Sequence, residues 1–428
     1  MSATPAPRGD FPILARTVRR GLPLVYLDSG ATSQRPQRVL DAVRAMDTQH
    51  NGAVKRGAHL LAEEASEAYE RAREQVAAFV GAAPDEIVWT SGSTQAINLV
   101  AYAMSNVSAG RGDSVESRRG VDPHVFSVGP GDVIVTTRAE HHANIIPWQE
   151  LCLRTGATLR WLDLDAEGRI DLSTLDRIDE HTKLVAFTHV SNVSGAISPV
   201  AQIVEAARKV GALTFLDACQ SVPHIPVDFH ELGVDFAAFS GHKMLGPTGI
   251  GALYGRAELL RALPPYQFGG SMIEVVTMEK TTYADPPARF EAGTMPVAQA
   301  IGMGEAAVYL TEIGMDKIAR YEAELTRRML ASLTKMPGIR ILGPEGESNR
   351  TGAVAFAVDG VHPHDVGQFL DSQGIAVRVG HHCAQPIHQH FGVFASTRAS
   401  LGPYNTVEEV DYFVESLAEV RRYFRVED

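Results

Sequence analysis

The chain has 428 residues, of which 45% are hydrophobic and 21% are charged, and this balance excludes a disordered, collagen-like or coiled-coil protein. No apolar run approaches the roughly 18 residues of a membrane helix, and we find no secretory signal near the N-terminus. The net charge of −12 is spread along the chain, which excludes a basic track for nucleic acid.

Strands and helices alternate through the first part of the chain. We expect strands at residues 86–89, 133–137, 158–162, 184–188, 213–216, 234–239 and 250–254. We expect helices between them at residues 95–104, 146–154 and 200–210. Apolar strands that alternate with helices of this length predict a mostly parallel, doubly wound α/β sheet.

A change of pattern near residue 298 predicts a second, smaller α/β domain. The expected elements there are a long helix at residues 302–334, a strand at 351–358, a helix at 364–373, a strand at 376–378 and a helix at 407–423. We therefore expect an N-terminal segment (1–28) that packs with the small domain, a large cofactor-binding domain (29–300) and a small domain (301–428). Residues 105–132 form a polar stretch longer than an ordinary connection, which indicates either a mobile surface insertion or a partner-binding loop. We favour the insertion.

Three polar features follow apolar strands. Asp217 and Lys243 each come directly after a strand, so both lie at the carboxyl edge of the sheet, where α/β folds bind ligands. The run SGST at residues 91–94 opens a helix whose N–H groups favour a phosphate. Each feature also has an ordinary interpretation, Asp217 as a helix N-cap and Lys243 as a surface ammonium. Together they match the ring-nitrogen partner, Schiff-base amine and phosphate anchor that pyridoxal phosphate requires.

His141 and His142 follow the strand at residues 133–137. An imidazole in this place stacks on a cofactor ring or relays protons near neutral pH. Paired histidines also suggest a metal, but the carboxylate and histidine spacing of a zinc site does not accompany them. We therefore expect no resident metal.

Cys383 is the candidate nucleophile among three cysteines, which are too few and too far apart for a disulfide framework and fit a reducing cytoplasm. Cys152 and Cys219 fit inert buried thiols. Cys383 instead lies in a polar loop whose histidines and arginine would lower its pKa. The competing interpretation is a zinc site, although its adjacent ligands suit a tetrahedron poorly. Its ligands would be His381, Cys383, His388 and His390.

Six motifs resemble those of SufS-type (type II) cysteine desulfurases, which belong to the class V aminotransferase group of fold-type I pyridoxal phosphate enzymes. They stand in order within a resemblance that runs from about residue 12 to residue 425. The motifs are YLDSGAT at 26–32, EHHAN at 140–144, HVSN at 189–192, SGHK at 240–243, FEAGT at 290–294 and RVGHHCA at 378–384. The combination of the lysine motif with the His-His-Cys motif is the most specific part of the resemblance.

The resemblance implies roles for particular residues. Lys243 would bind the cofactor, Asp217 would pair with its ring nitrogen, Gln220 would contact its phenolic oxygen and His141 would stack on its ring. The implied phosphate ligands are Ser93, Thr94, Ser240 and His242, with Thr294 reaching the phosphate of the neighbouring subunit in a homodimer. The implied substrate ligands are Asn192, Arg378 and Arg398, with His59 lining the site. From the residues alone, Arg398 fits either a carboxylate ligand or a surface ion pair.

The implied reaction converts L-cysteine to L-alanine for Fe–S cluster assembly. Lys243 would move the α-proton, the Cys383 thiolate would attack the substrate sulfur, and a persulfide would remain on Cys383. Residues 361–365 and 383–386 resemble members that pass sulfur to the zinc protein SufU rather than to SufE, with His364 engaging the zinc of the partner. The ordinary interpretation of His364 is a solvated histidine at a helix start.

Two other functions remain open at this stage. A selenocysteine lyase or a kynureninase-like β-lyase would use the same cofactor, and those that need no nucleophile would not need Cys383. A non-catalytic scaffold for Fe–S assembly proteins would use neither Asp217 nor Lys243. The presence of all three residues favours the desulfurase.

Overall fold

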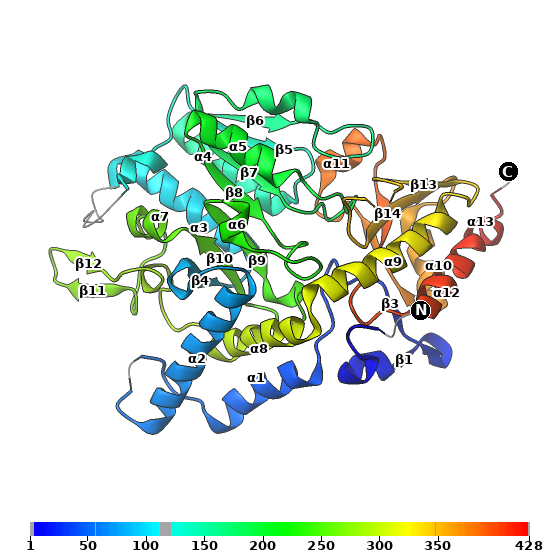
Figure 1. Ribbon diagram of the computed structural model, residues 1–428, viewed down its shortest axis with the longest axis horizontal. Helices are drawn as coiled ribbons and strands as arrows, with labels where there is room; N and C mark the ends of the chain where they lie inside the picture. The colour runs from blue at the N-terminus through cyan, green and yellow to red at the C-terminus, as the bar shows by residue number, and fades with distance from the viewer. Residues whose placement is uncertain (1–3, 56, 112–120, 347, 427–428) are drawn as a thin grey trace.

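The computed structural model describes residues 4–55, 57–111, 121–346 and 348–426, and a seven-stranded sheet forms the centre of its larger part (Figure 1). In spatial order the strands are β4 (Ile87–Thr90), β10 (Gly251–Gly255), β9 (Phe236–Ser240), β8 (Leu213–Asp217), β7 (Thr182–Thr188), β5 (Val133–Thr137) and β6 (Thr158–Leu162). Only β10 runs against its neighbours. The predicted mostly parallel α/β sheet is therefore confirmed.

Side chains of these strands alternate between two hydrophobic clusters because successive residues of a strand point to opposite faces. Val133 and Val135 belong to one cluster and Ile134 to the other. Helices α3 (Ser93–Asn106) and α4 (Ile146–Thr155) cover one face, and the opposite face is covered by α2 (Leu60–Phe79), α5 (Val200–Val210) and α8 (Val297–Ile313). Burial of each large apolar side chain stabilises this arrangement by about 1.5–3 kcal/mol.

The helix predicted as continuous over residues 302–334 is two helices. It breaks at Gly314, which has φ +90° and which separates α8 from α9 (Met315–Leu333). Helix α8 packs against α1 (Gln37–Gln49) and α2, and a Cβ on Gly304 would lie 2.8 Å from the Ala72 Cα. The terminal helix is likewise divided, into α12 (Val407–Ala418) and α13 (Val420–Tyr423). Gly314, an isolated glycine within the helical pattern, was the sequence signal for the break between α8 and α9.

A four-stranded antiparallel sheet forms the smaller part of the molecule. Its strands, in order, are β13 (Ile339–Ile341), β14 (Ala353–Val358), β17 (Ser396–Ser400) and β16 (Arg378–Gly380). Helices α9, α10 (Pro363–Ser372) and α12 share its hydrophobic cluster. The N-terminal segment lies against this part, since β3 (Val25–Tyr26) pairs with β15 (Ile375–Ala376). Strand β17, absent from our sequence prediction, carries Arg398.

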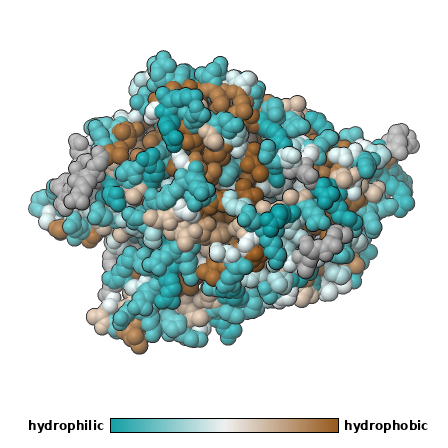
Figure 2. Space-filling view, viewed as in Figure 1, coloured by the Kyte–Doolittle hydropathy of each residue, from teal (hydrophilic) through white to brown (hydrophobic). Residues whose placement is uncertain are grey.

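The polar stretch at residues 105–132 is anchored in the core at its described ends, where Val107, Phe126 and Val128 are buried. Residues 112–120, on which the predicted insertion centres, lie outside the described residues. Hydrophilic residues cover most of the face shown in Figure 2. Within the described ranges, no helix is both long enough and apolar enough to cross a membrane.

A buried ion pair joins helix α2 to the segment that follows β12 (Thr281–Tyr283). Arg73 donates two hydrogen bonds to the Glu291 carboxylate, at 2.7 and 3.0 Å. Glu291 also accepts from the Trp89 backbone N–H at 2.9 Å and from the Tyr69 hydroxyl at 3.1 Å. Four donors to one buried carboxylate offset the cost of removing its charge from water.

We predict that Glu291→Gln destabilises the protein by about 3–5 kcal/mol, because it leaves the buried Arg73 charge with only the partly exposed Glu70 as an ionic partner. Urea unfolding of the purified protein measures this change. Asp411→Asn is the matched control, since Asp411 pairs with Arg328 on the exposed surface, where such pairs contribute about 0–1 kcal/mol. Equal losses in the two variants would contradict the prediction.

Candidate active site

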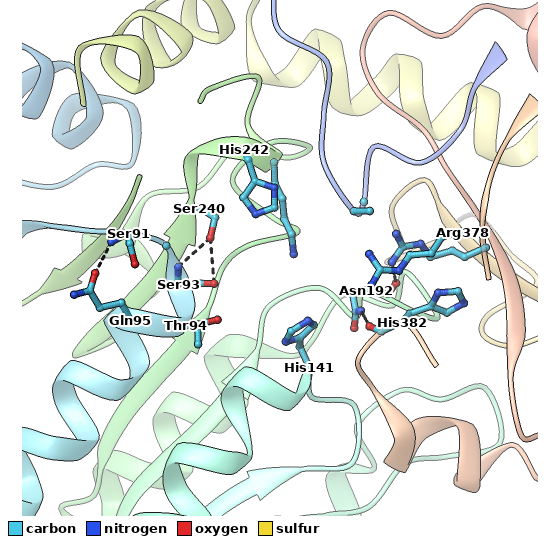
Figure 3. A pocket seen from close by; sticks show the side chains of 15 residues that line it. Ser91, Ser93, Thr94, Gln95, His141, Asn192, Ser240, His242, Arg378 and His382 are labelled. Atoms are coloured by element: carbon cyan, nitrogen blue, oxygen red, sulfur yellow. Dashed lines mark hydrogen bonds between the residues drawn. The ribbon is translucent and has the colours of Figure 1, made fainter. Parts of the chain in front are cut away.

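A cavity of about 300 Å³ lies beside the carboxyl ends of the parallel strands (Figure 3). Strands β5, β7 and β9 each lead into a segment that reaches it. Helix α3 and the small sheet supply the other walls. Lining residues that matter here are Ser93, Thr94, His141, Asn192, Ser240, His242, Lys243, Arg378, His382 and Arg398. Nine of these ten residues have a role in our sequence analysis, and the tenth, His382, directly precedes the candidate nucleophile. All ten meet in one cavity.

The N-terminus of α3 forms one corner of the cavity. The Ser240 hydroxyl accepts from the Ser93 backbone N–H at 2.9 Å and donates to the Ser93 hydroxyl at 3.2 Å. A Cβ on Gly251 would lie 2.6 Å from the Gly92 Cα, so only glycine lets β10 approach this turn. Free N–H groups and the helix dipole make the corner a site for an anion such as phosphate.

Lys243 and His141 also line the cavity, and Figure 3 shows the His141 ring pointing into it. Burial, followed by the Lys243 charge, lowers the pKa of His141 to about 3. The ring is therefore neutral at physiological pH. Because its Nδ1 accepts from the Ala143 N–H at 3.1 Å, the proton is on Nε2. A neutral imidazole in this position suits stacking on a ring better than ion pairing.

Asp217 and Gln220 are buried behind the cavity at the end of β8. Asp217 Oδ1 accepts from the Cys219 N–H at 3.0 Å, and Gln220 Nε2 donates to the Gly30 carbonyl at 2.8 Å. Burial raises the pKa of Cys219 to about 11, with the Asp217 charge as the next cause. Cys219 is thus the inert thiol that we expected, although it lies close to both Asp217 and Lys243.

Glu140 is a buried residue to which sequence reasoning gave no role. Its carboxylate accepts from the Thr137 hydroxyl and the Asn144 amide, each at 2.6 Å, and from the Thr188 N–H at 2.9 Å. Burial raises the pKa of Glu140 to about 8. These bonds join β5 to β7 and fix the backbone from which His141 projects. The signal was its place within the EHHAN motif.

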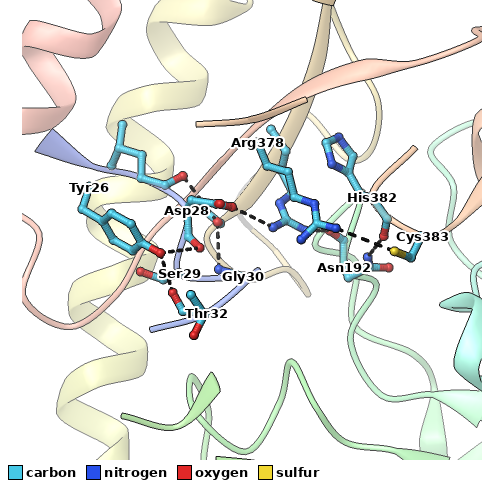
Figure 4. A network of polar contacts seen from close by, with 12 residues as sticks. Tyr26, Asp28, Ser29, Gly30, Thr32, Asn192, Arg378, His382 and Cys383 are labelled. Carbon is cyan, nitrogen blue, oxygen red and sulfur yellow. Dashed lines mark hydrogen bonds and ion pairs between the residues drawn. The ribbon is translucent and has the colours of Figure 1, made fainter. Parts of the chain in front are cut away.

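Arg398 is buried in the wall of the cavity and contacts Asp28 and Asn192, which Figure 4 labels. It donates to the Asn192 carbonyl at 2.9 Å and to Asp28 at 3.2 Å, while its Nε and the Asn192 Oδ1 have no partner among the described atoms. Burial lowers the pKa of Arg398 to about 10. A buried guanidinium with a free N–H on a cavity wall is suited to a substrate carboxylate. The surface ion pair that we considered for Arg398 is ruled out.

Cys383 lies on a strained turn that links β16 to α11 (Gln385–His390). His382 and Cys383 have φ values of +51° and +57°, in the left-handed region that costs non-glycine residues free energy. Asn192 Nδ2 donates to the His382 carbonyl at 2.6 Å, and the His142 N–H donates to the Cys383 carbonyl at 2.7 Å. Arg378 Nη2 lies 3.7 Å from the Cys383 sulfur.

Ser396 braces the same turn from behind. His388 Nδ1 lies 2.8 Å from the Ala384 carbonyl and must donate to it, so His388 Nε2 accepts from the Ser396 hydroxyl at 2.9 Å. The Ser396 hydroxyl has only one proton, which it donates to His388. His382 Nε2 must therefore be the donor in its hydrogen bond of 2.9 Å to the same hydroxyl. Burial lowers the pKa of His382 to about 2, which leaves a bare, buried lone pair on Nδ1.

The competing zinc site does not fit this geometry. Both ring nitrogens of His388 are engaged, and His390 Nε2 lies 2.8 Å from the Asp165 carbonyl. His388 therefore has no lone pair left for a metal ion, and His390 Nε2 must donate to the Asp165 carbonyl. The hydrogen bonds assign His388 to bracing the turn and His390 to the loop that contains Asp165.

Three residues with predicted roles are exposed and lie away from the cavity of this chain. His59 is exposed and caps helix α2, where its Nδ1 accepts from the Ala62 N–H at 3.3 Å. The expectation that His59 lines the site does not hold within a single chain, because the residue belongs to the outer end of α2. Thr294 is also exposed, and His364 is exposed in the first turn of α10.

The comparisons with known proteins agree with this arrangement. The model of the class-V aminotransferase family matches residues 25–117 and 120–413. A probable cysteine desulfurase of Mycobacterium leprae is 55% identical, over 97% of this chain and 96% of the relative, and one of Streptomyces coelicolor is 50% identical over 98% of each. The solved cysteine desulfurase of Thermococcus onnurineus has a TM-score of 0.89 at 36% identity, covering 99% of each chain.

The chain belongs to the class-V aminotransferase family and, within it, to the cysteine desulfurases. The cofactor is pyridoxal phosphate, and the cavity fits it. The α3 corner provides an anion site, Lys243 provides an amine, and the unpartnered Arg398 Nε and Asn192 Oδ1 await a polar ligand.

We predict that Ser396→Ala costs about 1–3 kcal/mol, because it leaves a buried donor on His382 and a buried acceptor on His388 without partners. Thermal unfolding of the holoenzyme measures the change. Ser173→Ala is the matched control, because Ser173 is exposed. A destabilisation no larger than that of the control would show that the hydrogen bonds of Ser396 with His382 and His388, the Ser396 relay, do not support the turn.

Proposed function

We propose that this chain removes sulfur from L-cysteine, releases L-alanine and holds the sulfur as a persulfide on Cys383. The observation that carries the proposal is the placement of a cysteine beside Arg378 on a strained turn, at the edge of a cavity that also holds Lys243 and Arg398. A scaffold protein would not need these residues in one place. The strained Cys383 turn would lower its stability without serving any reaction.

The residues divide the work by position. Arg398 binds the substrate carboxylate through its unpartnered Nε–H, and the unpartnered Asn192 Oδ1 accepts from a donor group of the ligand. His141 would cover one face of the cofactor, and Asp217 would hold the proton on its ring nitrogen. When bound, pyridoxal phosphate supplies the electron withdrawal that makes the substrate α-proton acidic and the substrate sulfur open to attack. Lys243 would move that proton.

The sulfur step balances without an external oxidant. The Cys383 thiolate forms an S–S bond with the substrate sulfur as the substrate Cβ–S bond breaks. The electron pair of the broken bond stays with the carbon and takes up a proton, which gives the methyl group of alanine. Sulfur is oxidised by the amount that carbon is reduced.

We predict that Cys383→Ala lowers alanine release from L-cysteine by about a hundredfold or more while the cofactor absorbance is kept. Cys152→Ala is the matched control, because burial raises the pKa of Cys152 to about 11 and the residue lies in the core of the large domain. Amino-acid analysis of the reaction measures the alanine. Equal activity of the two variants would favour a selenocysteine lyase or another β-lyase on the same cofactor.

We further propose that the enzyme is a SufS-type homodimer of the cytoplasm that serves Fe–S cluster assembly. The exposed positions of His59 and Thr294 support a dimer, since residues of a second subunit could then complete each site. Leu60 and Met278 are 66% and 97% exposed, which fits apolar surface that a second copy covers. Three unpaired cysteines fit a reducing compartment.

The proposed sulfur acceptor is a zinc protein of the SufU type rather than of the SufE type. His364 supports this proposal because its side chain is exposed at the start of α10, on the same sheet that carries the Cys383 turn. An exposed imidazole there can bind a zinc ion that the acceptor presents.

We predict that His364→Ala abolishes the stimulation of alanine release by a SufU-type acceptor and leaves the rate without acceptor unchanged. Gln368→Ala is the matched control, because Gln368 is exposed on the same helix. Alanine release is measured over a series of acceptor concentrations. Full stimulation of His364→Ala would refute the role of His364 and leave the desulfurase activity itself unaffected.

A further inference from the structure

His142 lies between the cofactor segment and the Cys383 turn, and the reaction as derived above does not use its side chain. Its neighbour His141 lines the cavity. His142 itself lines an adjacent groove of about 330 Å³, together with Cys383 and Ile146. The side chain therefore does not reach the substrate site.

His142 holds the Cys383 turn at two points. Its backbone N–H donates to the Cys383 carbonyl at 2.7 Å. Its Nε2 accepts from the Gln385 backbone N–H at 3.0 Å. The two bonds span the residues on either side of Ala384, so they fix the part of the chain that carries the nucleophile.

This turn needs such support because two successive non-glycine residues adopt left-handed backbone conformations. Strain of this kind persists only where the surroundings over-determine the backbone. Asn192 holds the His382 carbonyl, and the Ser396 relay holds the back of the turn. Among the described residues, His142 is the one whose side chain accepts from the N–H groups that follow Cys383.

We propose that His142 is the positioning residue for Cys383, a clamp that holds the strained turn against the cofactor segment and that requires an unprotonated Nε2. The inference rests on the proposed function for its consequence in catalysis, whereas the clamp itself is a property of the fold. Protonation of the ring replaces the acceptor by a donor, which repels the Gln385 N–H and releases the turn.

The clamp is closed at neutral pH. Burial, followed by the nearby His381, lowers the pKa of His142 below the ordinary histidine value of about 6.5. Release is therefore expected only as the pH falls below that value. The ionisable groups that face His142 from the surrounding elements are His141, Glu150, Arg154, His381 and Cys383.

We test the clamp by amide hydrogen exchange of the holoenzyme, followed in the peptide that contains Gln385. His142→Ala is expected to speed exchange of this amide about tenfold, and His142→Gln, whose amide oxygen can replace Nε2, is expected to restore slow exchange. In the wild type, protection beyond the intrinsic pH effect falls below pH 6.5, and in His142→Gln it does not. His181→Gln, at an exposed histidine of the same domain, is the matched control.

Steady-state kinetics give the second readout. His142→Ala is expected to lower kcat about tenfold while the KM for L-cysteine and the cofactor spectrum stay unchanged, and His142→Gln recovers activity. Unchanged exchange in His142→Ala overturns the clamp. If that variant does not fold, identical pH profiles of wild type and His142→Gln overturn it. Altered exchange without alanine release from any variant, wild type included, would uphold the clamp and reject the proposed function instead.

Discussion

The buried charge of Arg398 organises the rest of the site. A guanidinium that is removed from water must find partners, because an unpaired buried charge costs several kcal/mol. Arg398 finds them in Asp28 of the N-terminal segment and in the Asn192 carbonyl of the large domain, while the residue itself belongs to the small sheet. The N-terminal segment, the segment after β7 and the small sheet therefore meet at the Arg398 guanidinium.

The same charge also defines the cavity. A Cβ on Gly30 would lie only 3.1 Å from Arg398 Nη2, so the segment at residues 28–30 passes directly over the guanidinium. Arg398 Nε has no partner among the described atoms. The Arg398 guanidinium thus takes part in both folding and substrate binding. For this reason its protein partners occupy only some of its N–H groups.

The sequence predicted the fold well where apolar runs and strand ends carried the information. Seven of the cavity-facing residues, from Ser93 to Lys243, follow or precede recognisable strands, so their meeting at one sheet edge followed from topology. The break at Gly314 was missed because the helical pattern continues through it. The relay of Ser396 with His382 and His388 was missed because it depends on side-chain directions across two loops. His59 was placed in the cavity by resemblance alone, and no pattern in a single chain could show that α2 carries it outward.

The break between α8 and α9 falls close to the change from one core to the other. Most buried residues of α9 pack in the core of the small sheet, whereas α8 and Ile318, in the first turn of α9, pack in the core of the large sheet. The segment after Cys383 also belongs to the large core, through Ala384 and Ile387. The bonds that Asn192 and His142 make to the Cys383 turn join the same two regions. The distance between the nucleophile and the cofactor site is therefore set by side-chain packing as well as by hydrogen bonds.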